Sequence, residues 1–288
     1  MRETEKNKIS QSTLYLVATP IGNLADMSER AIKTLSEVDF IAAEDTRNSL
    51  RLLNYFGISK PLVSYYEHNK RERGQEIIER LLGGESCALI TDAGTPAISD
   101  PGEDLVRLCA ENGITVTSIP GACAVVNALA LSALSTTRFV FEGFLPVPKK
   151  QRRERLCELV SEQRTFILYE APHKLRTTLS DLAEALGEDR KISICRELTK
   201  LNEEIIRTTL SGACALYEER EPRGEYVLVI EGGTATQEEE SKEVTTDELR
   251  KALDKKILAG MKKNEAIRAV AEMYGLTRND VYSRLIEK

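Results

Sequence analysis

The chain has few histidines and no regular pattern of cysteines. Only His68 and His173 occur in 288 residues, which excludes a histidine-rich metal site. The six cysteines include no Cys-x-x-Cys pair, and this argues against a zinc site or a disulfide framework. Cys87 and Cys195 lie in apolar, strand-like segments, where a thiol acts as a small hydrophobe. We therefore expect a cytoplasmic protein without disulfides or metal ions.

Long apolar runs and a positive net charge are also missing. The longest apolar run, residues 122–134, contains Asn127 and is too short to span a bilayer. Residues 1–13 are polar and charged, which is unlike a signal peptide. The formal net charge of −6 does not suggest general affinity for nucleic acid. We expect no membrane partner, and any contact with RNA must come from local basic patches.

Three common motifs are absent. The chain has no Gly-x-Gly-x-x-Gly fingerprint, no Gly-Lys-Ser/Thr phosphate loop and no Gly-x-Ser-x-Gly elbow. The first two absences argue against ordinary dinucleotide binding and P-loop NTP binding. The third argues against a hydrolase with a serine nucleophile on that elbow.

Two loops rich in glycine and proline are the most informative segments present. Residues 18–23 follow the apolar segment 14–17, and residues 92–102 follow the apolar segment 87–90. Ligands of open α/β sheets bind beyond the carboxyl ends of the strands. Glycine lets a ligand approach the main chain closely, and proline fixes the loop. The loops predict a small-molecule pocket of backbone and apolar walls, which suits an adenine, a ribose and a sulfonium methyl donor.

Strand-like and helix-like segments alternate from residue 14 to residue 118, which predicts a mostly parallel, doubly wound sheet. Later strands follow one another with shorter turns, which predicts a mixed sheet. The expected strands are 14–18, 38–43, 62–66, 86–91 and 114–118, then 138–143, 165–170, 191–196, 205–209 and 225–231. The expected helices are 28–36, 46–55, 72–83 and 103–112, then 122–134, 151–162, 173–186 and 212–219. We thus expect an α/β protein with a disordered tail (1–13), an N-terminal lobe (14–120), a second lobe (121–233), a linker (234–244) and a helical domain (245–288).

The helical domain shows the spacing of a helix-turn-helix. Thr246, Asn264 and Thr277 are predicted N-caps of three helices, and Arg278 and Arg284 are predicted to contact nucleic acid. The alternative is a small bundle that only packs on the main domain. The expected apolar face of the middle helix comprises Ala266, Ile267, Val270, Ala271 and Met273.

A basic run marks the second lobe. Residues 149–155 hold five basic side chains in seven, among them Lys149, Lys150, Arg152 and Arg153. Neutralisation of phosphates drives nucleic-acid affinity, so we predict that this run contacts RNA. The alternative is an exposed basic helix start.

Six stretches of the chain resemble the tetrapyrrole methylase superfamily, which comprises S-adenosylmethionine-dependent methyltransferases without the Rossmann fingerprint. The chain resembles in particular the branch that methylates a ribose 2′-hydroxyl of a cytidine in the decoding region of 16S rRNA. The resemblance implies a two-lobed fold, a homodimer, a methyl donor bound between the lobes and the small ribosomal subunit as partner. The matching stretches are 17–24, 43–47, 91–102, 169–174, 196–200 and 224–226.

The resemblance also implies which residues bind the methyl donor. Members that act on tetrapyrroles usually carry Gly-Asp-Pro where this chain has residues 94–96, and Gly-Pro-Gly where it has residues 20–22. The backbone roles of both loops can survive these changes. The implied donor-binding residues are Ile21, Gly22, Ala93, Gly94, Thr95, Ile98, Cys123, Ala124, Tyr169 and Glu170.

The acceptor side of the site is implied by charged residues after three strands. Asp45 occupies the place of a proton-accepting aspartate in relatives, so it is a candidate base, with Arg47 orienting it or binding phosphate. A structural ion pair is the alternative for Asp45.

Two further charged groups are assigned to the same side. His173 and Lys174 are predicted to contact RNA phosphate, and the alternative for His173 is a structural role in which it satisfies nearby carbonyls. A cluster that follows an apolar strand is predicted to form an acceptor-side wall, with a solvated charge run as the alternative. This cluster comprises Arg196, Glu197 and Lys200.

Two other functions remain open from the sequence. The same fold and cofactor can serve a tetrapyrrole or a protein side chain as acceptor. An α/β sensor joined to a helix-turn-helix can also be a ligand-controlled DNA-binding regulator. Catalytic turnover, as opposed to binding of duplex DNA, separates the enzyme from the regulator.

Overall fold

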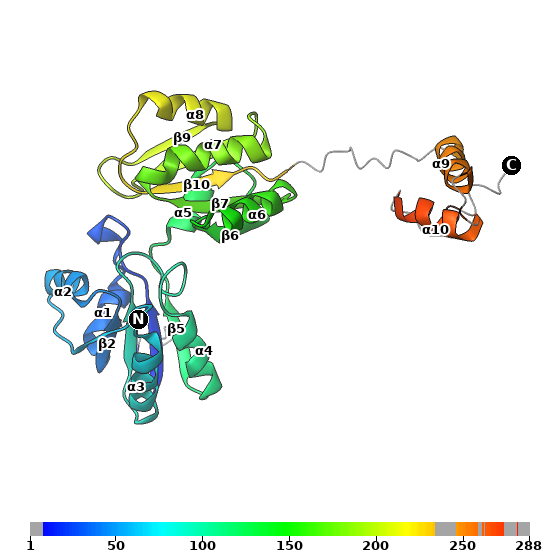
Figure 1. The fold of residues 1–288 in the computed structure, drawn as a ribbon. Helices are drawn as coiled ribbons and strands as arrows, with labels where there is room; N and C mark the ends of the chain where they lie inside the picture. The colour runs from blue at the N-terminus through cyan, green and yellow to red at the C-terminus, as the bar shows by residue number, and fades with distance from the viewer. Residues whose placement is uncertain (1–7, 234–245, 259–260, 262, 274–280, 282–288) are drawn as a thin grey trace. The chain divides into compact units, whose positions relative to one another are not determined.

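The computed structural model describes residues 8–233, 246–258, 261, 263–273 and 281 (Figure 1). The chain divides into two compact units, Met1–Gly232 and Gly233–Lys288. The first unit contains two lobes, each built on its own five-stranded sheet. In the described part of the chain, no helix combines the length and the apolar character that a membrane span requires.

The first lobe is a doubly wound parallel sheet in the order β3-β2-β4-β1-β5. Every residue of the neighbouring strands β2 and β4 is buried, as expected for a parallel sheet that is covered on both faces. The strands are β1 (Thr13–Val17), β2 (Phe40–Ala43), β3 (Leu62–Ser64), β4 (Cys87–Ile90) and β5 (Thr115–Ile119).

Two helices cover each face of this sheet (Figure 1). Alternate residues of one strand point to opposite faces, so Ile41 packs against the first pair of helices and Phe40 against the second pair. The first pair is α1 (Glu29–Glu37) and α2 (Thr46–Tyr55), and the second is α3 (Lys70–Leu82) and α4 (Glu103–Glu111). A short 3-10 helix, η1 (Leu24–Asp26), precedes α1.

The second lobe has a mixed sheet in the order β6-β7-β10-β8-β9, in which only β6 and β7 are parallel. One face carries α6, α7 and α8, and the other face carries α5. The parallel first sheet and the mixed second sheet confirm the predicted two-lobed α/β fold. The strands are β6 (Phe139–Gly143), β7 (Thr165–Glu170), β8 (Lys191–Arg196), β9 (Glu204–Thr209) and β10 (Tyr226–Ile230), and the helices are α5 (Ala124–Leu131), α6 (Lys149–Val160), η2 (Pro172–Lys174), α7 (Leu175–Leu186) and α8 (Leu210–Glu219).

The second unit contains α9 (Thr246–Leu258) and α10 (Lys263–Met273). Helix α10 begins at Lys263, so Asn264 lies inside the helix and the prediction that it is the cap was wrong. Met273 is 66% exposed and does not belong to the apolar core as predicted, because that face ends one turn earlier. Four other predicted residues of the α10 face are buried together: Ala266, Ile267, Val270 and Ala271.

Several expectations fall on residues outside the described part of the chain. These are the linker (234–244), the start of the tail (1–7), and the third terminal helix with Arg278 and Arg284. At the end of the predicted tail, Ser10 donates its backbone N–H to the Tyr15 hydroxyl at 2.8 Å, and Ser12 donates to the Glu85 carbonyl at 3.1 Å. The chain is therefore tied to the first lobe before β1 begins.

Candidate active site

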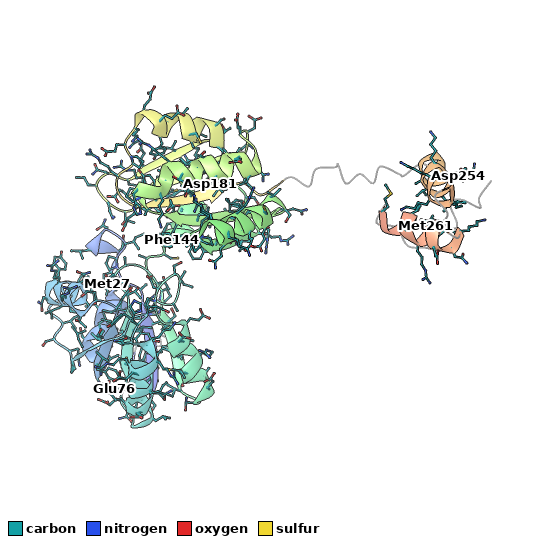
Figure 2. The ribbon with its side chains drawn as sticks, in the orientation of Figure 1. Met27, Glu76, Phe144, Asp181, Asp254 and Met261 are labelled. Atoms are coloured by element: carbon teal, nitrogen blue, oxygen red, sulfur yellow. The ribbon has the colours of Figure 1, made fainter. Side chains whose placement is uncertain are left out.

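A pocket of about 450 Å³ is lined by residues of both lobes of the first unit. Figure 2 labels Phe144, which lines this pocket and lies where the two lobes meet. All the residues predicted to bind the methyl donor line it except Gly22. They are Ile21, Ala93, Gly94, Thr95, Ile98, Cys123, Ala124, Tyr169 and Glu170.

The two glycine- and proline-rich loops meet because their strands are neighbours. Strands β1 and β4 pair in parallel, so both loops leave the same edge of the sheet. The Thr19 N–H donates to the Gly94 carbonyl at 2.9 Å, and the Gly94 N–H donates to the Thr19 carbonyl at 3.0 Å. The Thr95 hydroxyl donates to the Ala122 carbonyl at 3.0 Å. The Thr95 hydroxyl therefore holds the start of the second lobe against the pocket.

The second loop is folded tightly over the end of β4. Ala97 and Ser99 have φ of 68° and 61°, a region that residues with a side chain rarely adopt. Gly102 has φ of 144°, and a Cβ atom there would lie 2.8 Å from Leu89 Cδ2. Such strain is typical of functional sites and persists only where the surroundings impose it. Here it places Ser99 and Asp100 in the pocket lining.

Asp100 is the site residue that the sequence analysis missed. Burial first, and then the charges of Glu44 and Asp92, raise the pKa of its carboxyl to about 7. Burial also raises the pKa of Glu44. Because β2 and β4 are neighbours, these acidic residues follow the ends of adjacent strands. The sequence does show carboxylates after two predicted strands. Only the pairing of β2 with β4 shows that these carboxylates lie close together.

Asp45 is held in a different environment, outside the pocket lining. It caps α2, and Oδ1 accepts hydrogen bonds from Arg47 N at 2.8 Å and Arg47 Nε at 3.2 Å. These hydrogen bonds and the guanidinium charge lower the pKa of the Asp45 carboxyl to about 2. A carboxylate of such low pKa is a weak general base. The structure thus shows the ion pair that was the alternative reading of Asp45.

Glu170 enters the pocket from the end of β7 and is only 4% exposed. Its Oε1 accepts the Ala171 N–H at 2.8 Å, and its Oε2 accepts the Thr178 hydroxyl. Arg152 donates to Thr178 Oγ1 at 2.8 Å and to Asp181 Oδ2 at 2.6 Å. The Arg152 side chain is only 15% exposed. Its guanidinium therefore organises this buried network.

The cluster of Arg196, Glu197 and Lys200 makes ion pairs of its own and does not line the pocket. Lys200 Nζ lies 2.9 Å from Glu197 Oε1 and 2.6 Å from Oε2 of Glu225, which does line it. The Lys200 stem also covers Gly22, where a Cβ atom would lie 2.3 Å from Lys200 Cγ. This contact accounts for the absence of Gly22 from the pocket lining.

Arg196 is held by the two neighbouring segments of the second lobe. Its Nε donates to the Arg223 carbonyl at 2.7 Å, and its Nη1 lies 3.6 Å from Glu204 Oε2. Its side chain is 17% exposed. An acceptor-side role for this residue and for the Glu197–Lys200 pair stays a prediction.

The remaining basic residues lie in a second depression. Lys149, Arg152, Arg153, His173 and Lys174 line a groove between α6 and α7, and Figure 2 marks its position by Asp181. Lys150 is not part of the lining, since it lies on another side of α6 and pairs with Glu154 at 3.9 Å.

The donor pocket has the charge that a sulfonium cation requires. Asp100, Glu170 and Glu225 contribute carboxyl groups, and no lysine, arginine or histidine occurs among the described residues of the lining. A positive ligand is favoured there because opposite charges attract strongly where water is partly excluded. Phe144 and Tyr169, with ring centroids 5.6 Å apart, add an aromatic wall for a flat base. The residues present therefore fit S-adenosylmethionine.

Comparison with known proteins agrees with this fit. The family of Tetrapyrrole (Corrin/Porphyrin) Methylases matches residues 13–214. The chain is 48% identical over 275 residues to Ribosomal RNA small subunit methyltransferase I of Synechocystis sp., which covers 95% of this chain and 97% of that protein. It is 45% identical over 276 residues to the protein of the same name from Bacillus subtilis, covering 96% and 94%.

Solved structures show the same fold at low sequence identity. A cobalt precorrin-4 methyltransferase matches with a TM-score of 0.57 and 18% identity, covering 76% of this chain and 95% of that one. The uroporphyrin-III C-methyltransferase of Thermus thermophilus, complexed with S-adenosyl homocysteine, matches with a TM-score of 0.54 and 15% identity, covering 76% and 97%. These likenesses concern the fold.

Proposed function

The chain belongs to the tetrapyrrole methylase family, and from this premise we propose that it transfers a methyl group from S-adenosylmethionine to the 2′-hydroxyl of a cytidine in 16S rRNA. The observation that carries the proposal is the near full-length similarity to small subunit rRNA methyltransferases. The pocket supports it, because its lining has carboxyl groups and no fixed cation in the described residues.

The donor-binding residues are those that line the pocket from both lobes. The loop over the end of β4 supplies backbone at Ala93 and Gly94 and apolar contact at Ile98, and the second lobe supplies Tyr169 and Glu170. When bound there, S-adenosylmethionine supplies an electrophilic methyl group. The protein contributes alignment of the two reacting atoms, which can account for a large part of the acceleration of a direct displacement.

Asp100 is the proposed general base. The Asp100 carboxylate, which lines the pocket, would accept the proton that the ribose hydroxyl loses when its oxygen takes the methyl group. A carboxyl with a pKa of about 7 is ionised in a large fraction of molecules at neutral pH and still binds a proton well. Asp45, whose pKa is about 2, meets only the first of these requirements.

A homodimer in the cytoplasm is part of the proposal. Large apolar side chains are exposed on α5, where Val126 is 56% exposed and Leu131 is 38% exposed. Contact with a second copy would cover them. Light scattering of the purified protein measures the mass directly, and a monomer at micromolar concentration contradicts a stable dimer.

The test is methyl transfer from labelled S-adenosylmethionine to small ribosomal subunits from cells that lack this enzyme. We expect label at one ribose 2′-hydroxyl of a cytidine, located by mapping the modified nucleotide. Label on a base or on a protein contradicts the proposed acceptor. Tight donor binding without transfer to the subunit contradicts the proposed substrate and favours a tetrapyrrole acceptor or a DNA-binding sensor.

A further inference from the structure

A groove of about 620 Å³ runs between α6 and α7 on the second lobe. Helix α6 presents Lys149, Arg153 and Leu156 to it, a spacing of four and three residues that places side chains on one helix face. Lys174 and Thr177 face it from the start of α7. The groove is thus built from two neighbouring helices.

The cations of this groove differ in how firmly they are paired. Arg152 is bound to Asp181 and Thr178, so its charge is largely neutralised. Lys149, Arg153 and Lys174 have no ion pair within the described part of the chain. Glu184 is the one other acidic residue of the described lining. The groove therefore keeps a positive excess facing water.

The donor pocket and the groove are lined by consecutive residues of the chain. Residues 170–172 line the pocket, and residues 173–174 line the groove. The two depressions are also linked by hydrogen bonds in which Arg152 donates to Thr178 and Thr178 donates to Glu170. A polymer that places one ribose in the pocket has this basic groove immediately beside it.

We propose that the groove between α6 and α7 binds the phosphodiester backbone of the RNA next to the methylated nucleotide. The inference rests on the proposed function, since it requires RNA as the substrate. Lys149, Arg153 and Lys174 contact phosphate, while Arg152 is a positioning residue that joins α6 to α7. A positive groove that follows the backbone is a common way to hold a single strand without reading its sequence.

The test compares two variants of the protein. One lacks three positive charges of the groove, and the other lacks three positive charges elsewhere. The groove variant is Lys149→Gln with Arg153→Gln and Lys174→Gln. The control variant combines three substitutions of lysines outside the groove lining, so both proteins change net charge equally. The control substitutions are Lys8→Gln, Lys33→Gln and Lys191→Gln.

Binding to small ribosomal subunits that lack the modification is measured between 50 and 200 mM salt. For three lost contacts to a single strand, the slope of log affinity against log salt becomes shallower by about 2. We also expect at least a tenfold loss of affinity at the lowest salt, and unchanged donor binding and melting temperature. For the control variant, we expect the slope to differ from that of the unaltered protein by no more than the change that the loss of about one phosphate contact would cause.

The outcomes separate the groove from the proposed function. If the unaltered protein methylates the subunit but the groove variant matches the control in slope and affinity, the groove does not bind the RNA backbone. If the unaltered protein methylates no RNA, the proposed function itself has failed. Equal loss in both variants means that the net charge matters and the groove does not.

Discussion

The Arg47 guanidinium lies 2.9 Å from Asp45 Oδ2 and holds this carboxylate at the start of α2. Glu44, the preceding residue, belongs instead to the acidic group around Asp100. The pKa values of these two neighbouring carboxyls shift in opposite directions. The pKa of Asp45 is lowered because it is paired with a cation, and the pKa of Glu44 is raised because it is partly buried beside other carboxylates. At the end of β2, the pKa of Asp45 is thus lowered, whereas the pKa values of Glu44 and of the nearby Asp100 are raised.

Asp100→Asn should lower kcat by about 10²-fold or more, because general-base catalysis typically contributes about 10²–10⁴-fold. The side chain keeps its size, and Glu170 and Glu225 remain in the pocket lining, so donor affinity should change by no more than a few-fold. In the unaltered enzyme the rate should rise with pH through about 7, where the carboxyl loses its proton. Single-turnover methylation across pH measures both effects.

Asp45→Asn serves as the comparison. Because the carboxylate is already neutralised by Arg47, we expect a rate within a few-fold of the unaltered enzyme and the same pH profile. A loss as large as that of Asp100→Asn, with normal donor binding, would assign the base to Asp45.

The raised pKa of Asp100 also predicts a pH-dependent stability. The folded protein holds this proton up to about pH 7, whereas an unfolded chain releases it near the ordinary aspartate pKa of 3.8. The unfolded state therefore binds fewer protons between these values, and the contribution of Asp100 to stability falls as pH rises through that window. Asp100→Asn should raise the unfolding free energy at pH 8 by about 1 kcal/mol, or about 2–4 °C, after allowance for partial solvation. Melting curves at pH 4 and pH 8 measure this, and an equal effect at both contradicts it.

The bounds of helices and strands were predictable where local sequence patterns define them. Strands 165–170 and 191–196 and helix 46–55 have their predicted bounds, because apolar runs and a capping aspartate define them locally. Helix α6 begins at Lys149, two residues before the predicted start, because Pro148 precedes its first turn.

Side-chain partners were less predictable than the elements. The basic run was expected to face RNA as a whole, yet Arg152 joins a buried network, Lys150 pairs with Glu154 and Arg155 pairs with Glu142. Residues only a few positions apart point in different directions around a helix, so a run of like charges divides among faces. The position of Asp100 beside Glu44 depends on strand pairing, which short-range patterns do not contain.

Thr178→Val should destabilise the second lobe. The hydroxyl donates to Glu170 and accepts from Arg152, so its loss leaves two buried polar groups without this partner. A loss of about 1–3 kcal/mol in the unfolding free energy is expected, measured by denaturant unfolding. Thr177→Val is the matched control on the neighbouring exposed position, where the change should stay within about 0.5 kcal/mol.

Gly102→Ala tests whether the tight second loop forms the donor pocket. At φ of 144° a side chain is strained, and the added Cβ atom would lie 2.8 Å from Leu89 Cδ2 and 3.1 Å from Ala97 N. We expect a loss of about 2–3 kcal/mol in the unfolding free energy and a weaker donor affinity, because Ala93 and Ile98 move with the loop. Gly113→Ala, at φ of 68° with no atom within 4 Å of the new Cβ, is the control and should cost about 1 kcal/mol without changing donor binding. Calorimetric titration with S-adenosylmethionine measures the donor affinity of both variants, and melting curves measure their stability. Unchanged donor affinity in a destabilised Gly102→Ala protein would mean that the loop supports the fold but does not shape the pocket.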